Sequence, residues 1–283
     1  MATDDGQPAG RHDAFAPAKI NLTLHVTGQR ADGYHLLDSL VVFADLGDHL
    51  SLAAAASPAL HVSGPMAQVV PTGPENLVLR AAARMGVTLD IRLDKHLPAA
   101  AGIGGGSSDA AAVLRGIAAL RPDIGLPPDQ GLSLGADVPV CLRARAARME
   151  GIGERVSPVD DLPPLHAVLV NPGIAVSTAT IFRSLARKDN PPMPEILPGW
   201  GDATALAGWL AVQRNDMQAA AIAAEPLVGQ VIAAIAATDG CLLARMSGSG
   251  ATCFGLYADT QAAGRAAASL ARPGWWVRAA RLS

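Results

Sequence analysis

Between residues 19 and 26, apolar and polar side chains alternate without interruption. Ile20, Leu22, Leu24 and Val26 occupy every second position, and this period predicts a strand with one buried face. Successive side chains of a strand point to opposite faces. The pattern therefore groups four polar residues on the other face, namely Lys19, Asn21, Thr23 and His25.

Apolar periodicity along the rest of the chain predicts a mixture of strands and helices. Strands are expected at residues 36–44, 48–52, 60–63, 89–93, 166–173 and 275–282, with a hairpin over 147–159 and a strand, tight turn and strand over 242–257. Helices are expected at 76–85, 105–120, 177–186 and 260–271, and three alanine-rich ones within 202–237. This order favours an α+β fold with helices on one face of a sheet.

The run Asp-Asp-Leu-Pro-Pro at residues 160–164 is the best candidate domain boundary, because polar and proline-rich segments link domains. We therefore predict an amino-terminal lobe over 14–160 and a carboxy-terminal lobe over 165–283. The polar residues 1–13 before them are expected to form a flexible tail.

Composition is that of an ordinary soluble globular protein, with 283 residues, 50% hydrophobic residues, 17% charged residues and a formal net charge of −3. No basic face for nucleic acid is expected. Polar residues 1–13 contain no apolar segment for a signal peptide, and polar breaks in the apolar stretches argue against a membrane span. Three cysteines without a C-x-x-C pair predict reduced thiols and a cytoplasmic location.

The most informative segment is the glycine-rich run from Pro98 to Leu114, which leads into an alanine-rich helical pattern. Glycines let successive backbone N–H groups face one concave surface, and a helix N-terminus behind them adds unpaired donors. The run therefore predicts a phosphate site, while a flexible turn capped by Ser107 or Ser108 is the alternative. It is not a Walker loop, which needs lysine where Ser107 stands, nor a dinucleotide fingerprint, whose third glycine Ser107 replaces.

Three further features carry candidate chemistry. Of the 22 lysines and arginines, only three are lysines, namely Lys19, Lys95 and Lys188. Lys19 is therefore a candidate point charge on phosphate, and an ordinary solvated lysine is the alternative. Asp137, in Gly-Ala-Asp-Val-Pro, is either a proton acceptor or a turn or helix cap. The Ser-Gly-Ser-Gly run at 247–250 predicts a hairpin turn that offers N–H groups to an anion or backs the first loop.

The motifs PAKINL, RADGYH, GGGSSDAA, GADVP and SGSGAT, spread in this order over residues 17–252, resemble those of the galactokinase–homoserine kinase–mevalonate kinase–phosphomevalonate kinase superfamily. PAKINL followed closely by RADGYH resembles the branch that phosphorylates 4-diphosphocytidyl-2-C-methyl-D-erythritol with ATP, a step of non-mevalonate isoprenoid biosynthesis. The resemblance implies a two-lobed kinase. Its amino-terminal lobe would be a ribosomal-protein-like α/β domain and its carboxy-terminal lobe ferredoxin-like.

The resemblance also implies roles for individual residues. Asp137 would be the catalytic carboxylate and Lys19 its charged partner, Asn21 would touch the methylerythritol part, and Tyr34, His35 and Phe182 would hold the cytosine end. Mg²⁺ would be held mainly by the ATP phosphates, with Ser108 or water. The residues implied to bind ATP are Asn76, Lys95, Pro98, Ala99, Ala100, Ala101, Gly102, Ile103, Gly104, Gly105, Gly106, Ser107 and Ser108.

Two features depart from the family pattern. Ala100 and Ala101 stand where many relatives carry glycine, which stiffens the loop. The segment before Gly135 is short, which puts the position of Asp137 in question. The open alternatives are a mevalonate or homoserine kinase, a non-catalytic binding protein on the same scaffold, and a dinucleotide-binding oxidoreductase. The expected partners are the two small-molecule substrates, without nucleic acid or membrane, in a monomer or weak homodimer.

Overall fold

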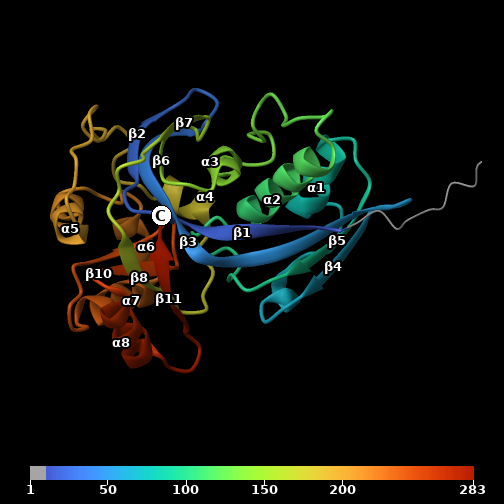
Figure 1. Cartoon of the computed structure of the whole chain (residues 1–283). Coiled ribbons are helices and arrows are strands. Elements are labelled where there is room, and N and C mark those ends of the chain that lie inside the picture. Colours follow the sequence, from blue (N-terminus) through green and yellow to red (C-terminus); the bar gives the residue numbers. More distant parts are fainter. Residues whose placement is uncertain (1–10) are drawn as a thin grey trace, which may run out of the picture.

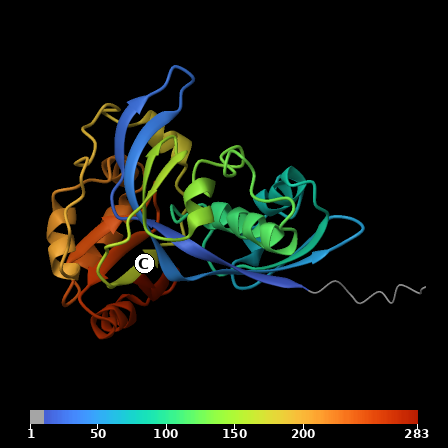
Figure 2. The same ribbon diagram turned by 45° about the horizontal axis from the view of Figure 1, so that its top comes forward.

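The structure is a computed structural model that describes residues 11–283, and the first ten residues of the predicted tail lie outside the described part. Within the described part, eleven strands form one continuous sheet, in which β3 of the first half meets β11 of the second (Figure 1). Helices lie on either side of that junction in two groups. The two groups of elements form two lobes that meet along β3 (Figure 2).

The amino-terminal lobe is built around the long strand β3, His35–Ala54, which pairs with β1, β2, β5, β6 and β11. The sequence pattern predicted two short strands here, but the chain stays extended across the region between them. The other elements of this lobe are β1 (His12–Asn21), β2 (His25–Gln29), β4 (Ala59–Ser63), the single 3-10 turn η1 (Ala67–Val69), α1 (Leu77–Arg84), β5 (Leu89–Asp94), α2 (Gly105–Leu120), α3 (Val138–Arg143), β6 (Ala147–Gly151) and β7 (Arg155–Pro158).

The carboxy-terminal lobe has four antiparallel strands in the order β11-β8-β10-β9. Helices α7 and α8 pack against these strands. Its elements are β8 (Leu165–Asn171), α4 (Thr178–Arg183), α5 (Ala203–Ala211), α6 (Gln218–Ala224), α7 (Pro226–Ala236), β9 (Leu243–Met246), β10 (Cys253–Tyr257), α8 (Thr260–Leu270) and β11 (Trp276–Leu282). Strands β7 and β8 pair within different lobes, on either side of the proposed boundary at 160–164.

The single strand predicted over residues 19–26 is wrong in one respect. Strand β1 ends at Asn21, and the chain becomes a strand again in β2 at His25. Between them, Leu24 bonds to the backbone of the second lobe, accepting from Asp216 N–H and donating to the Arg214 carbonyl, both at 2.8 Å. Both faces of the segment are buried, because both lobes cover the polar face. Asp137 and Ser39 of the first lobe contact Lys19 and Asn21, and Met193 and Arg214 of the second lobe contact Thr23 and His25.

The predicted tail is also too long by two residues, since His12 and Asp13 pair with Leu52 and Ser51 as the start of β1. Their register against β3 continues the strand that carries Lys19.

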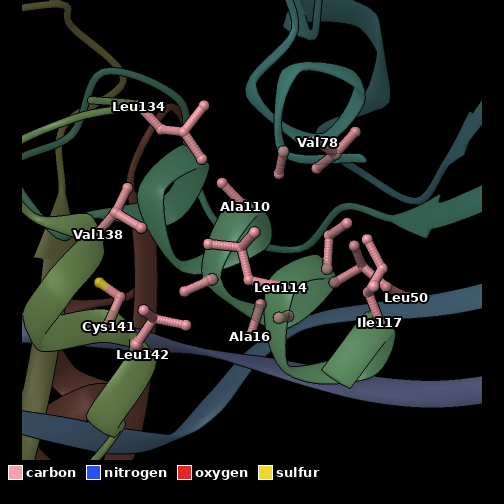
Figure 3. Close-up of a cluster of buried hydrophobic side chains, with 14 of the residues drawn as sticks. Ala16, Leu50, Val78, Ala110, Leu114, Ile117, Leu134, Val138, Cys141 and Leu142 are labelled. Carbon is pink, nitrogen blue, oxygen red and sulfur yellow. The ribbon is translucent and has the colours of Figure 1, made fainter. Parts of the chain in front are cut away.

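Helix α2 is the centre of the first lobe's core and places the glycine-rich loop. Ala110, Leu114 and Ile117 point into a cluster with side chains of β3 and α3 (Figure 3). A methyl group on Gly116 would lie 2.4 Å from Leu52 Cδ1, so glycine lets the helix approach β3 closely. This close packing fixes the N-terminus of α2 relative to β1 and β3.

No single helix of residues 11–283 is long and apolar enough to cross a membrane; α6 and α7 reach that length only together, across a bend of 119°.

Candidate active site

A cleft of about 410 Å³ lies between the lobes and collects most of the motifs from the sequence. The first lobe contributes Lys19, Asn21, Asp137 and the glycine-rich loop. The second lobe contributes the start of α4 and the turn after β9. The residues from that lobe are Val176, Thr178, Phe182, Met217, Gly248 and Ser249.

The glycine-rich loop presents the open N-terminus of α2 to this cleft. Gly104 precedes the helix in a left-handed conformation, with φ of 65°. The first N–H groups of a helix have no intrahelical acceptor, so those of Gly105, Gly106 and Ser107 are available where these residues line the cleft. Such an end attracts an anion. Ala100 also has a positive φ, 49°, so one of the two alanines that replace the family's glycines adopts a conformation in which glycine is favoured.

The second glycine turn supports the first across the lobe boundary. Ser247 Oγ donates to the Gly102 carbonyl at 3.0 Å, and the Thr252 N–H donates to the Ala101 carbonyl at 3.1 Å. A methyl group on Gly102 would lie 2.4 Å from the Ser247 carbonyl oxygen. Of the two roles predicted for this turn, the structure therefore supports the backing of the first loop.

Lys19 and Asp137 form the charged centre of the cleft. Lys19 Nζ lies 2.9 Å from Asp137 Oδ2, and their side chains are 4% and 32% exposed. The lysine is therefore not the solvated one of the alternative interpretation. Asp137 occupies the N-cap position of α3, but its side chain makes no capping hydrogen bond and instead contacts Lys19. The short segment before Gly135 forms consecutive tight turns and still brings Asp137 to Lys19.

The loop and the lysine are fixed to one another. The Lys19 N–H donates to the Ile103 carbonyl at 2.9 Å, and the lysine's aliphatic stem lies against Gly104. Ser108 Oγ donates to the Pro17 carbonyl at 2.7 Å. β1 therefore carries Lys19 and also holds the loop through which phosphate would bind.

Asn21 lies beside this centre with one polar atom free. Its Nδ2 donates to Ser39 Oγ at 2.8 Å, whereas its buried Oδ1 has no hydrogen-bond partner among residues 11–283. A buried acceptor without a partner is costly, so a ligand hydroxyl in the cleft would satisfy it.

Of the three residues predicted to hold the base, the structure brings two together. The rings of His35 and Phe182 stack with centroids 4.3 Å apart and planes 13° from parallel. Burial, and then the charge of Lys188, lower the pKa of His35 below its ordinary value, which favours the neutral ring. Tyr34 is 58% exposed and lines a separate hollow with Gly135 and Ala136. The ring that stacks on Phe182 is therefore that of His35 and not that of Tyr34.

Two residues expected to contact ATP have polar partners within the protein, and their predicted contact with ATP stays a prediction. Asn76 caps α1, accepting from the Val78 N–H at 3.0 Å and donating to the Pro71 carbonyl at 2.6 Å. Lys95 is buried beneath the loop between Asp48 and Asp109. The sequence alone does not indicate these partners of Asn76 and Lys95. Four other residues predicted to bind ATP also lie outside the lining of the cleft, namely Pro98, Ala99, Ile103 and Ser108.

The second-lobe wall contains polar residues that the sequence analysis missed. Thr178 and Ser249 bring their hydroxyl oxygens to 2.7 Å of one another, at the start of α4 and in the second glycine turn. The Ser-Gly-Ser-Gly motif could have indicated Ser249. Thr178 and Met217 carry no local signal, because only the packing of the lobes brings them to the cleft.

Comparisons with known proteins show the family of this chain. Residues 76–151 match the model of the GHMP kinases N terminal domain, and residues 199–274 match that of the GHMP kinases C terminal domain. A 4-diphosphocytidyl-2-C-methyl-D-erythritol kinase of Dinoroseobacter shibae is 61% identical over 280 residues, which are 97% of this chain and 96% of the relative. The chain belongs to this kinase family. It is a small-molecule kinase, and the family implies the use of ATP.

Solved structures give the same result. A crystal structure of a 4-(cytidine 5'-diphospho)-2C-methyl-D-erythritol kinase superposes with a TM-score of 0.79 at 35% identity, covering 96% of this kinase and 99% of that chain. The homoserine kinase of Cytophaga hutchinsonii superposes with a TM-score of 0.62 at 16% identity, covering 99% and 96%. The second likeness shows the shared two-lobed fold alone. The predicted α+β kinase fold is therefore confirmed.

Proposed function

We propose that this kinase transfers the γ-phosphoryl group of ATP to the 2-hydroxyl of 4-diphosphocytidyl-2-C-methyl-D-erythritol. The observation that carries the proposal is the Lys19–Asp137 ion pair beside the open N-terminus of α2, in a chain of this family. Phosphoryl transfer to an alcohol needs a carboxylate and a cation beside a phosphate-binding loop. The same family supports the placement of the reaction in non-mevalonate isoprenoid biosynthesis.

Asp137 is the proton acceptor in this proposal. Its carboxylate is one-third exposed toward the cleft, whereas Lys19 is almost fully buried behind it. The hydroxyl of the acceptor would donate its proton to Asp137 as its oxygen attacks the γ-phosphorus, and ADP would leave. Lys19 orients Asp137 through their contact at 2.9 Å, and its charge opposes the negative charge on the transferring phosphoryl group.

The substrate would bind along the cleft from this centre toward the second lobe. Asn21 Oδ1 is a free buried acceptor for a hydroxyl of the methylerythritol part. His35 and Phe182 offer aromatic surface for the cytosine, with Tyr34 nearby in its exposed loop. Aromatic stacking is tolerant of base identity, so hydrogen bonds from His35 and nearby backbone would reject uracil.

Mg²⁺ is proposed to arrive with ATP. The described residues contain no group of three or more His, Cys, Asp or Glu side chains that could hold a metal ion. Ser108, considered as a ligand from the sequence, is buried and donates its hydroxyl to Pro17. The phosphates and water would therefore hold the ion, which when bound neutralises charge on the transferring group. The cytoplasmic location and the monomeric or weakly dimeric state stay predictions.

The test is a coupled assay for ADP release with the purified protein. The proposal expects release that depends on the cytidyl substrate and much slower release with mevalonate or homoserine in its place. Equal rates with the uridyl analogue would contradict the base assignment. ADP release only with mevalonate or homoserine would contradict the proposed substrate.

A further inference from the structure

Three charged side chains are buried together beneath the glycine-rich loop. Lys95 Nζ contacts Asp48 Oδ2 and Asp109 Oδ2 at 2.5 Å each, and none of the three side chains is more than 4% exposed. Burying charges is expensive unless each is paired at good geometry, so such a group needs a reason beyond stability. The reaction as proposed above uses none of the three.

The contacts of this cluster join the two ends of the loop. Asp48 Oδ1 accepts from the N–H groups of His96 at 2.6 Å and Leu97 at 2.9 Å, where the chain leaves β5. Asp109 lies in the second turn of α2, after the loop has ended. Lys95 links the two carboxylates, so one buried ion network fixes both the entry and the exit of residues 98–104.

The cation lies directly under the first residue of the helix. A methyl group on Gly105 would lie 3.3 Å from Lys95 Nζ. The N–H of Gly105 is one of the donors proposed to face the ATP phosphates. A small displacement of Lys95 would therefore move those donors, and displacements of about 1 Å are costly in such sites.

We propose that Lys95 is a positioning residue: with Asp48 and Asp109 it holds the loop at both ends and thereby sets the affinity for the triphosphate of ATP without touching it. The proposal rests on the loop being the phosphate site of the proposed function. Direct contact between Lys95 and ATP is the competing account. The carboxylates already occupy the buried ammonium, and Lys95 is absent from the lining of the cleft.

A double-mutant cycle on ATP binding separates the two accounts. ATP affinity is measured by equilibrium titration without the cytidyl substrate, so the result does not depend on the acceptor being correct. Lys95→Met leaves two buried carboxylates facing one another and should weaken ATP binding at least about tenfold. Asp109→Asn keeps an acceptor for Lys95 and should weaken binding less.

The decisive protein is the double variant Lys95→Met with Asp109→Asn, which removes one of the two uncompensated carboxylates. Positioning expects it to bind ATP at least about fivefold more tightly than Lys95→Met alone. Direct contact expects no recovery, and that result overturns the proposal. Should Lys95→Met not fold by itself, the double variant is compared with Asp109→Asn: similar affinities support positioning, and a tenfold weaker double variant contradicts it.

Two further measurements complete the design. Arg92→Met removes an exposed positive charge from the same strand β5 and should leave ATP affinity within about twofold. In turnover assays Lys95→Met should raise the KM for ATP and leave the KM for the cytidyl substrate nearly unchanged, which general destabilisation would not do. If the wild type binds ATP but does not phosphorylate the cytidyl substrate, the proposed function fails while the cycle still tests the positioning role.

Discussion

Replacing Asp137 with asparagine tests the proton acceptor directly. Asparagine keeps the size of the side chain and an oxygen near Lys19 Nζ. It removes the basic carboxylate, which in the wild-type protein lies 2.9 Å from that nitrogen. A general base contributes about 10²–10⁴ to the rate, so turnover should fall by that factor. At about 1.4 kcal/mol for each tenfold, the barrier rises by about 3–5.5 kcal/mol.

The structure also limits the accompanying loss of stability. Removing one partner of a fully buried ion pair costs about 3–5 kcal/mol, but the Asp137 side chain is 32% exposed and its charge is screened. Asp137 makes no capping bond that the substitution would remove. We therefore expect the free energy of unfolding to fall by only about 1–2 kcal/mol, so the variant should remain folded at assay temperature.

The assay is ADP release at saturating ATP and cytidyl substrate, with ATP affinity and denaturant unfolding measured on the same preparation. Asp123→Asn is the matched control, because Asp123 is an exposed acid whose partner is Arg121. Retention of more than half of the wild-type turnover by Asp137→Asn would remove this carboxylate from the mechanism.

Four further outcomes follow from the structure. Lys19→Arg should lose most activity with little change in melting temperature, because the planar guanidinium cannot occupy the confined space beside Gly104; full activity would indicate a generic charge. Phe182→Ala and His35→Ala should each raise the KM for the cytidyl substrate several-fold and spare that for ATP, whereas a changed ATP KM would refute the base site. Ala100→Gly should raise the free energy of unfolding by about 0.5 kcal/mol, since it relieves a left-handed alanine, and a loss in urea titration would contradict this. Burial, and then Arg214, lower the pKa of His25, so below about pH 6.5 the unfolded chain binds more protons than the folded one and the contribution of His25 to stability falls as the pH drops. His25→Gln should therefore reduce the difference between the free energies of unfolding measured at about pH 5.5 and about pH 7.5.

The sequence predicted the elements whose signals are local. Helix α2 begins within the glycine run, directly after Gly104, and α1 begins after Asn76, because capping and backbone freedom act over a few residues. The Lys19–Asp137 pair was reached only through motif resemblance, since its members are far apart in the chain. Their separation of 2.9 Å is a product of the tertiary fold.

The predictions that failed concern burial by distant segments. The alternation around Leu22 predicts one exposed face, yet distant segments of both lobes cover it. For Lys95, which stays a predicted neighbour of ATP, the sequence gives no sign that β3 brings Asp48 to its ammonium group. Likewise, nothing near Tyr34 and His35 in the sequence indicates which of the two rings meets Phe182. Each of these contacts involves a partner more than ten residues away, which local periodicity does not encode.

The most direct test of the central claim is the position of the transferred phosphate. The wild-type protein is incubated with ATP and 4-diphosphocytidyl-2-C-methyl-D-erythritol, and the product is examined by phosphorus and carbon NMR. The account predicts one new phosphomonoester, coupled to carbon 2, formed in equal amount to ADP and lost in Asp137→Asn. A phosphate on another hydroxyl, or ADP formed without any phosphorylated cytidyl product, would contradict it.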